Sequence, residues 1–311
     1  KEGYLKVEVL GFHLPYNKAG LVVIKNQQRI FNKILPAWLE LAIDGKIKIF
    51  EDASLLHEYM TKEEIIPMVQ NMNLAGNVSN GIIMDQGAIE KFIQDSLAYL
   101  EKRGYGELCL DIEGVKYENK ERFTNFVDRV AASLHEAGIS LSICIPAKTG
   151  NNADSTWSGA YDYKLLGQIV DRVIIMAYDF HWPGGPPGPI APLGWLQDLI
   201  DYAIIEIPLE KIYFALGLYG YDWPLLAEER SRGLVYKQIE EIARRYQREI
   251  EWDQESCCPY LKYEDNGVEH EVWFENKRSI GLKIRLLQEF QLKGVAFWRP
   301  GQEDPGVWEL F

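Results

Sequence analysis

The chain has 311 residues, 47% of them hydrophobic, which is enough for one large domain or a domain with an insertion. Its net charge is −13 and no basic run or stripe occurs, which argues against nucleic acids and anionic membrane surfaces as partners. No segment approaches the roughly 20 apolar residues of a membrane span, so we expect no membrane partner.

The first half of the chain alternates between strand and helix patterns. No export signal stands at Lys1, so we expect a mature form or an excised domain. Asp44-Gly45 between alternating apolar residues indicates a hairpin within 43–49. The patterns predict strands at 6–12, 34–40, 65–71 and 107–115, and helices at 25–33, 86–103 and 120–137.

The second half continues this alternation. The patterns predict strands at 140–146, 172–179, 211–218 and 294–298, and helices at 160–168, 193–205 and 279–290. A sequence of about eight strands separated by helices implies parallel crossovers and a closed (β/α)8 TIM barrel. A doubly wound open sheet is the alternative, and the absence of a glycine-rich phosphate turn after the first strand weakens it.

One segment departs from the alternation. Between Asp222 and Trp273 the patterns predict a helix at 235–246 and short strands, and Asn266-Gly267 is a strong hairpin signal. We therefore predict a barrel formed by residues 1–221 and 275–311, with a small α+β insertion at 222–274. In a barrel, an insertion after the seventh strand lies on the active face and forms one wall of a groove.

Two acids end the buried strand that contains Cys109. Residues two apart in a strand point to the same side, so Asp111 and Glu113 face the same way, roughly 6–7 Å apart, with Cys109 one step deeper. Two acids at such a position are costly to bury unless they are paired or used. A salt bridge or a helix cap is the simpler explanation of the isolated pattern, whereas acids at the carboxyl ends of barrel strands favour catalysis.

Aromatic residues are frequent, with nine Trp and seventeen Tyr. Several lie at predicted strand ends or in loops, where such side chains often line a concave site that stacks sugar rings, although ordinary packing is the alternative. The four Cys do not make a disulfide scaffold and the five His are scattered, so we expect no metal and no cofactor. The aromatic candidates are Trp38, Tyr178, Trp182, Tyr219, Tyr221, Trp223 and Trp298.

Four strand-end motifs together resemble glycoside hydrolase family 18, the chitinase-like family, over nearly the whole chain. The motifs are Leu110-Asp111-Ile112-Glu113, Met176-Ala177-Tyr178-Asp179, Gly217-Leu218-Tyr219-Gly220-Tyr221-Asp222-Trp223 and Gly294-Val295-Ala296-Phe297-Trp298. Three further stretches are similar to a bacterial branch of spore-cortex and cell-wall N-acetylglucosaminidases. These stretches lie at 178–192, 252–275 and 298–305.

The resemblance implies a retaining mechanism in which the substrate's own 2-acetamido oxygen attacks and forms an oxazolinium ion. Glu113 would be the general acid and then the base. Asp111 would orient the acetamido nitrogen, and Tyr178 would hydrogen-bond the acetamido oxygen. The expected substrate-binding residues are Asp179, Trp298, Met176, Tyr219, Tyr221, Trp38 and Trp182.

The signature strand departs from the family pattern, which has acids seven, four and two residues before the last Glu. Here those positions hold Gly106, Cys109 and Asp111. The inner acid normally shares a proton with the one above it, and Cys109 cannot do so in the same way. We expect an active enzyme with a shifted pH profile.

The expected substrate is a β-1,4-linked polysaccharide that contains N-acetylglucosamine (GlcNAc), with peptidoglycan favoured over chitin. We expect a monomer at an extracellular, cell-wall or spore location. A non-catalytic carbohydrate-binding protein is the main alternative, but such relatives commonly lose the acid at the position of Glu113. A barrel hydrolase with two protein carboxylates is a weaker alternative.

Overall fold

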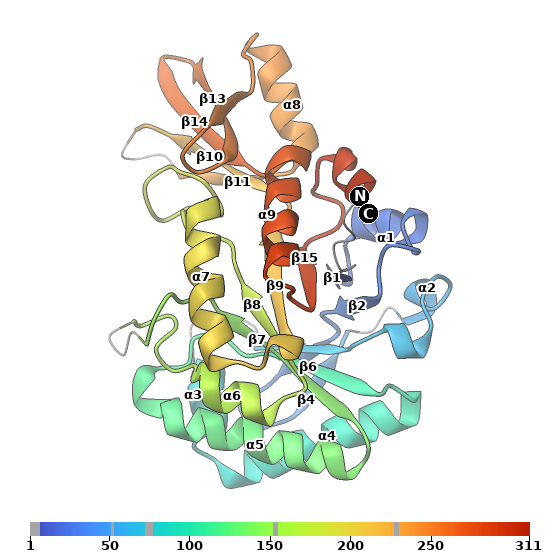
Figure 1. The fold of residues 1–311 in the computed structure, drawn as a ribbon. Helices are drawn as coiled ribbons and strands as arrows, with labels where there is room; N and C mark the ends of the chain where they lie inside the picture. The colour runs from blue at the N-terminus through green and yellow to red at the C-terminus, as the bar shows by residue number, and fades with distance from the viewer. Residues whose placement is uncertain (1–6, 51–52, 72–76, 152–154, 227–229) are drawn as a thin grey trace.

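The computed structural model describes residues 7–50, 53–71, 77–151, 155–226 and 230–311, and Figure 1 shows its fold. Lys6, which we assigned to the first strand, lies outside these residues. The larger sheet has the order β2-β1-β15-β9-β8-β7-β6-β5-β3-β4, and every pair in it is parallel except β3 with β4. Its strands are β1 (Glu8–His13), β2 (Lys33–Pro36), β3 (Leu39–Leu41), β4 (Ile47–Ile49), β5 (Met68–Gln70), β6 (Glu107–Asp111), β7 (Ser140–Pro146), β8 (Arg172–Met176), β9 (Ile212–Gly217) and β15 (Gly294–Trp298).

This sheet curls until its first strand, β2, meets the segment before β5. Ile34 in β2 forms a parallel bridge with Ile65, just before β5, and the Ile66 N–H donates to the Ile34 carbonyl at 2.8 Å. Because β5 also pairs with β6, the bridge joins the two sides of the sheet into a barrel. The predicted fold class is therefore confirmed, and the hairpin at Asp44-Gly45 is the antiparallel pair β3–β4.

Alternating side chains separate two cores. In β6, Leu108 and Leu110 belong to the large cluster between the strands and the outer helices, whereas Cys109 belongs to the cluster inside the barrel. Because the alternation has a period of two, Asp111 points to the same side as Cys109, at the carboxyl end of the barrel. The interior cluster consists of Leu10, Phe12, Leu35, Ala37, Ile66, Met68, Cys109, Cys144, Ile174, Met176, Tyr213, Ala215 and Ala296.

The helices mostly agree with the predicted ones. Helix α4 begins after Asp85, whose side chain accepts the N–H groups of Gly87 and Ala88, and ends at Gly104, which has a φ of 75°. The α-helices are α1 (Lys18–Asn26), α2 (Ala53–Leu56), α3 (Asn77–Ile82), α4 (Gln86–Arg103), α5 (Lys120–Glu136), α6 (Tyr163–Ile169), α7 (Leu193–Glu206), α8 (Tyr236–Arg245) and α9 (Lys277–Glu289). Short 3₁₀ helices occur at Lys62–Glu64, Tyr117–Asn119, Leu209–Lys211 and Pro305–Leu310.

The predicted helix at 25–33 is wrong. The helix in this region, α1, begins at Lys18 because the Asn17 side chain caps it by accepting the Gly20 N–H at 3.0 Å, and it ends at Asn26. No helix within the described residues is both long and apolar enough to cross a bilayer.

A second sheet lies between β9 and β15 in the chain and stands above the barrel with α8 in Figure 1. Its order is β11-β10-β14-β13-β12, and its pairs are antiparallel. Asn266-Gly267 turns between β13 and β14, with φ of 50° and 84°. We did not predict β10 and β11, and the domain boundaries at 222 and 274 stay a prediction. The strands are β10 (Gly220–Pro224), β11 (Arg232–Leu234), β12 (Glu251–Asp253), β13 (Cys258–Asp265) and β14 (Val268–Phe274).

Candidate active site

Asp111 is the last residue of β6 and is 5% exposed. Gln70, the last residue of β5, lies opposite Asp111 in the sheet, and its Nε2 donates to Asp111 Oδ2 at 2.9 Å. The other oxygen, Oδ1, is buried and has no hydrogen-bond partner among the described residues. This carboxylate can therefore accept one further donor from the direction of the barrel mouth.

The backbone after β6 is held by side chains from other elements. The carbonyls of residues 112, 113 and 114 each accept a hydrogen bond, respectively from Tyr161 Oη at 2.7 Å, Asn71 Nδ2 at 2.9 Å and Asn80 Nδ2 at 2.9 Å. Asn71 Oδ1 also accepts the Glu113 N–H at 2.8 Å, so one amide holds both backbone groups of Glu113. Three residues that lie far apart in the sequence, Asn71, Asn80 and Tyr161, thereby hold the backbone around Glu113.

The pKa values of both acids are raised above their usual values. Burial and the charges of Asp111 and Asp179 raise the pKa of Glu113 to about 8. Burial also raises the pKa of Asp111, to about 6, against the lowering effect of the Gln70 hydrogen bond. A carboxyl whose pKa is raised in this way can hold a proton for donation, and the adjacent carboxylate can stabilise positive charge.

Tyr178 and Asp179 follow β8 and lie near these acids. Burial raises the pKa of Tyr178 well above its usual value, and the charges of Asp111, Glu113 and Asp179 add to this effect, so the phenol stays a neutral donor. Asp179 has a φ of 58°, in the left-handed region that few non-glycine residues adopt. The structure brings the candidate acid, its neighbour and this tyrosine together.

The hydroxyls of Tyr219 and Tyr221 both donate to Asp179 Oδ1, the second at 2.8 Å. These hydrogen bonds lower the pKa of Asp179, whereas desolvation, the larger effect, raises it. Two aromatic hydroxyls from the segment after β9 therefore orient a carboxylate from the segment after β8.

Trp298 ends β15 and packs beside Tyr178. The two rings lie 6.5 Å apart between centroids with planes 25° apart, and the Phe12 ring meets Trp298 edge-on at 5.4 Å. Met176 is 9% exposed and belongs to the interior cluster against which Tyr178 and Trp298 pack. Met176 thus supports these rings from below.

A cavity of about 290 Å³ opens between the barrel mouth and the second sheet. Asp179, Tyr219, Tyr221 and Trp298 form one part of its lining. The full lining is Leu14, Asp179, Tyr219, Tyr221, Gly233, Leu234, Val235, Trp298, Arg299 and Gln302.

The candidates Trp38, Trp182 and Trp223 do not line this cavity, and neither do Asp111, Glu113, Tyr178 and Met176. Trp38 has no exposed surface and packs near His57 and Tyr105 in the core between strands and helices, so it cannot contact a sugar there. We expected it to line a concave site because it stands at a strand end, but its ring points outward from the barrel. Trp182 is 56% exposed in the loop after β8 and does not line the cavity.

Several residues at the site were missed from the sequence. Gln70 and Asn71 end a predicted strand, which is the same signal that identified Asp111. Asn80 and Tyr161 carry no local signal, since only the folded chain places them beside β6.

The interior below Asp111 contains two thiols. Cys109 Sγ and Cys144 Sγ lie 3.7 Å apart, and both cysteines are free and buried. The contact with Cys109, and then burial, raise the pKa of Cys144 well above its usual value, so its thiol is neutral. The part of the chain that the structure describes contains no group of three or more His, Cys, Asp or Glu arranged to hold a metal ion.

The model of the family described as "Glycosyl hydrolases family 18" matches residues 74–303. The cortical fragment-lytic enzyme of Bacillus anthracis is 33% identical over 276 residues, which cover 86% of this chain and 64% of that protein. The putative sporulation-specific glycosylase YdhD of Bacillus subtilis (strain 168) is 36% identical over 212 residues, 67% of this chain and 50% of that protein. The chain thus spans less than two thirds of the length of either relative.

Solved structures agree in fold. The spore cortex-lytic enzyme SleL of Bacillus cereus has a TM-score of 0.91 at 30% identity, covering 100% of this chain and 74% of that one. A chitinase from Chromobacterium violaceum ATCC 12472 has a TM-score of 0.89 at 23% identity and covers 98% of both chains. The second likeness supports the fold alone.

Proposed function

This chain belongs to glycosyl hydrolase family 18, and from that premise we propose that it cleaves β-1,4-linked polysaccharide containing GlcNAc. The observation that carries the proposal is the pair at the end of β6. Burial and the charges of Asp111 and Asp179 raise the pKa of Glu113, and the neighbouring Asp111 has a buried oxygen that no described residue satisfies. A free acceptor beside a proton donor fits a substrate that brings its own nucleophile.

In the first step, Glu113 donates its proton to the glycosidic oxygen, and the bond between this oxygen and the anomeric carbon breaks. The acetamido oxygen of the same sugar bonds to the anomeric carbon and gives the oxazolinium ion. Asp111 Oδ1 accepts the acetamido N–H and stabilises the positive charge that develops there. Tyr178 donates to the acetamido oxygen and holds it in line for attack.

In the second step, water attacks the anomeric carbon and gives a proton to the Glu113 carboxylate. The oxazolinium ring opens, the acetamido group is restored, and the configuration at the anomeric carbon is retained. Asp179, oriented by Tyr219 and Tyr221, holds the sugar or the water, and Trp298 supports the face of the reacting ring.

We favour peptidoglycan as the polymer and a cell-wall or spore location. The names of two relatives, a cortical fragment-lytic enzyme and a sporulation-specific glycosylase, support this choice. We further propose that the chain acts as a monomer, which light scattering of the purified protein would test.

The test is digestion of purified cell-wall sacculi and of chitin oligomers by the parent and by Glu113→Gln. Products ending in reducing GlcNAc, lost in the variant, are the expected result. Binding of sacculi without any product would instead favour a carbohydrate-binding protein, the alternative that we considered from the sequence.

A thiazoline analogue of the oxazolinium ion separates the two catalytic routes. Strong inhibition is expected if the acetamido group is the nucleophile. Insensitivity, together with a sugar trapped covalently on a carboxylate, would favour a mechanism with two protein carboxylates.

A further inference from the structure

Arg299, the residue after β15, is half-buried in the lining of the 290 Å³ cavity. No ion pair joins it to a carboxylate within the described ranges, although the chain as a whole has a net charge of −13. Burial lowers the pKa of Arg299, and no neighbouring charge offsets this effect. A guanidinium that is partly desolvated without a counter-ion is costly, so a bound anion would stabilise it.

Three other arginines form ion pairs within the described residues. Arg172 Nη1 lies 3.3 Å from Glu107, Arg129 Nη2 lies 2.6 Å from Glu90, and Arg232 Nη2 lies 2.9 Å from Asp222. Arg129 and Arg172 are partly buried like Arg299, and each has a carboxylate partner, whereas no ion pair of Arg299 occurs among the described residues.

Gln302 supplies a second unsatisfied group to the same cavity. Its Oε1 is buried and has no hydrogen-bond partner among the described residues. Arg299 and Gln302 thus offer a cationic donor and a neutral acceptor, three residues apart, next to Trp298. A ligand group that carries a carboxylate and an O–H or N–H donor would satisfy both.

We propose that the Arg299–Gln302 side of the cavity binds a carboxylate-bearing substituent on the sugar next to the reacting GlcNAc. This inference rests on the proposed function and names the substrate class. Chitin has no carboxylate, whereas every second sugar of peptidoglycan is a muramic acid with a lactyl ether at O3. That ether ends in a carboxylate or in a peptide that carries one. Arg299 would therefore select peptidoglycan over chitin.

The alternation of the polymer makes the location consistent. If GlcNAc occupies the position over Trp298, both of its neighbours in the strand are muramic acids. A lactyl group then lies beside the reacting sugar whichever way the polymer runs across the barrel mouth. The guanidinium fork suits a carboxylate because two N–H groups can donate to its two oxygens.

The experiment compares four tetrasaccharides. Three alternate GlcNAc with muramic acid and carry a free lactyl carboxylate, a stem peptide or a neutral lactyl methylamide, and the fourth is chitotetraose. We measure kcat/KM for the parent, Arg299→Met and Arg285→Met. Arg285 is an exposed residue of α9, so its substitution removes the same charge away from the cavity.

The parent should prefer a carboxylate substrate over the methylamide by about 10- to 100-fold, the range expected for a charged hydrogen bond. Arg299→Met should abolish most of this preference and Arg285→Met should retain it. The substrate that gives the larger preference, free lactyl or stem peptide, identifies the source of the carboxylate. Equal rates of the parent on the carboxylate and methylamide forms would overturn the proposal without requiring any variant to fold.

Binding distinguishes a failure of this inference from a failure of the proposed function. Calorimetry of Glu113→Gln with the carboxylate and methylamide fragments should show the same preference, because it needs no turnover. If the parent cleaves nothing but the preference persists, the proposed function fails and the carboxylate site stands. If turnover depends on Glu113 and no preference exists, the carboxylate site fails.

Discussion

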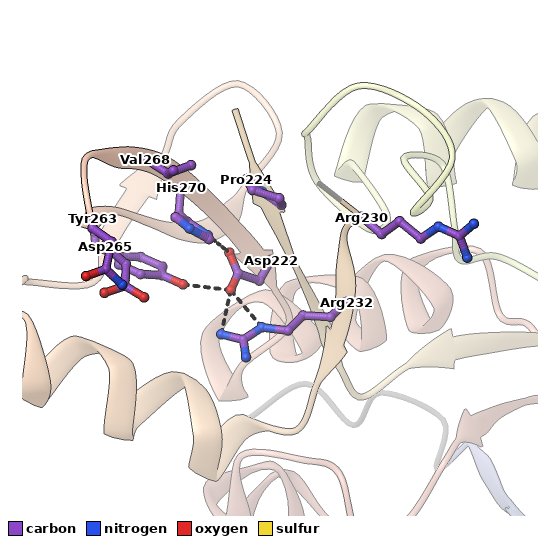
Figure 2. A pocket seen from close by; sticks show the side chains of 9 residues that line it. Asp222, Pro224, Arg230, Arg232, Tyr263, Asp265, Val268 and His270 are labelled. Atoms are coloured by element: carbon purple, nitrogen blue, oxygen red, sulfur yellow. Dashed lines mark hydrogen bonds and ion pairs between the residues drawn. The ribbon is translucent and has the colours of Figure 1, made fainter. Parts of the chain in front are cut away.

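Two buried carboxylate sites in this molecule differ in how completely their oxygens are satisfied. On the second sheet, Asp222 has no exposed side-chain surface, yet it accepts four hydrogen bonds (Figure 2). Arg232 donates through Nε at 3.0 Å and Nη2 at 2.9 Å, the Tyr263 hydroxyl donates at 2.7 Å, and His270 Nδ1 lies 2.8 Å away. These partners come from β11, β13 and β14, so Asp222 joins four strands.

At the end of β6 the buried carboxylates have fewer hydrogen-bond donors than Asp222 has. Asp111 and Glu113 lie close enough for one charge to raise the pKa of the other, Gln70 supplies a neutral amide, and Asp111 Oδ1 has no partner among the described residues. Burial alone therefore does not indicate function. A buried carboxylate with a full set of donors stabilises the fold, whereas one with a spare oxygen and a displaced pKa is a candidate for chemistry.

The arginines repeat this contrast. Arg232 points its guanidinium at Asp222, while Arg230, in the same pocket, points away from it (Figure 2). Arg232 is paired and ties β11 to β10, whereas Arg299, in the cavity beside Trp298, has no ion pair with any residue that the structure describes. We therefore place ligand recognition at Arg299 and not at Arg232.

The largest effect should come from the proton donor. Glu113→Gln should lower kcat on wall fragments by about 100- to 10,000-fold, because an amide cannot protonate the leaving oxygen. Glu118→Gln, at an exposed position of the same loop, is the matched control and should keep the parent rate. Comparable rates for Glu113→Gln and the parent would show that Glu113 is not the proton donor.

The next effect concerns stability. Asp222→Ala should lower the free energy of unfolding by about 2–4 kcal/mol, since His270 and Tyr263 lose a buried acceptor while the largely exposed Arg232 regains water. Urea unfolding measures this, and the pH–rate profile of the folded variant should match that of the parent. A variant as stable as the parent would show that full satisfaction of Asp222 does not stabilise the sheet.

A smaller effect should follow from loosening the backbone of the proposed acid. Asn71→Ala removes both hydrogen bonds to the Glu113 backbone and should lower kcat about tenfold with little change in KM, since the residue acts on the position of Glu113. Separate determination of kcat and KM checks this. A change in KM alone would argue for a direct role of Asn71 in substrate binding.

The smallest effect is a shift in pH dependence. The rate of the parent should rise as Asp111 ionises near pH 6 and fall as Glu113 loses its proton near pH 8. Cys109→Asp places a carboxyl below Asp111, and while neutral it can donate a hydrogen bond to the Asp111 carboxylate. The acid limb should then move down by about one pH unit. Identical profiles of kcat/KM would contradict a role for the Cys109 thiol.

Elements whose limits depend on local chemistry could be predicted closely. Strands β7 and β15 and helix α4 begin and end at the predicted residues, because alternation, apolar spacing and capping groups act over a few residues. The strand-end motifs also identified Asp111, Glu113, Tyr178 and Trp298 as one group. The prediction of helix α1 was wrong because it did not use the capping signal at Asn17. Strand β11 was not predicted because Arg232-Gly233-Leu234 has no strand pattern of its own.

Other features are decided only when the chain folds. Whether Trp38 faces a cleft or the core depends on which side of β2 and β3 the helices cover. No local sequence pattern predicts which side that is. The spare oxygen of Asp111, the donors that complete Asp222 and the missing counter-ion of Arg299 are all results of distance between remote residues. The sequence by itself determined which groups could do chemistry and where the strands place them. The tertiary structure decided which of those groups are satisfied and which remain free to act, because hydrogen bonding and desolvation are properties of the packed neighbourhood.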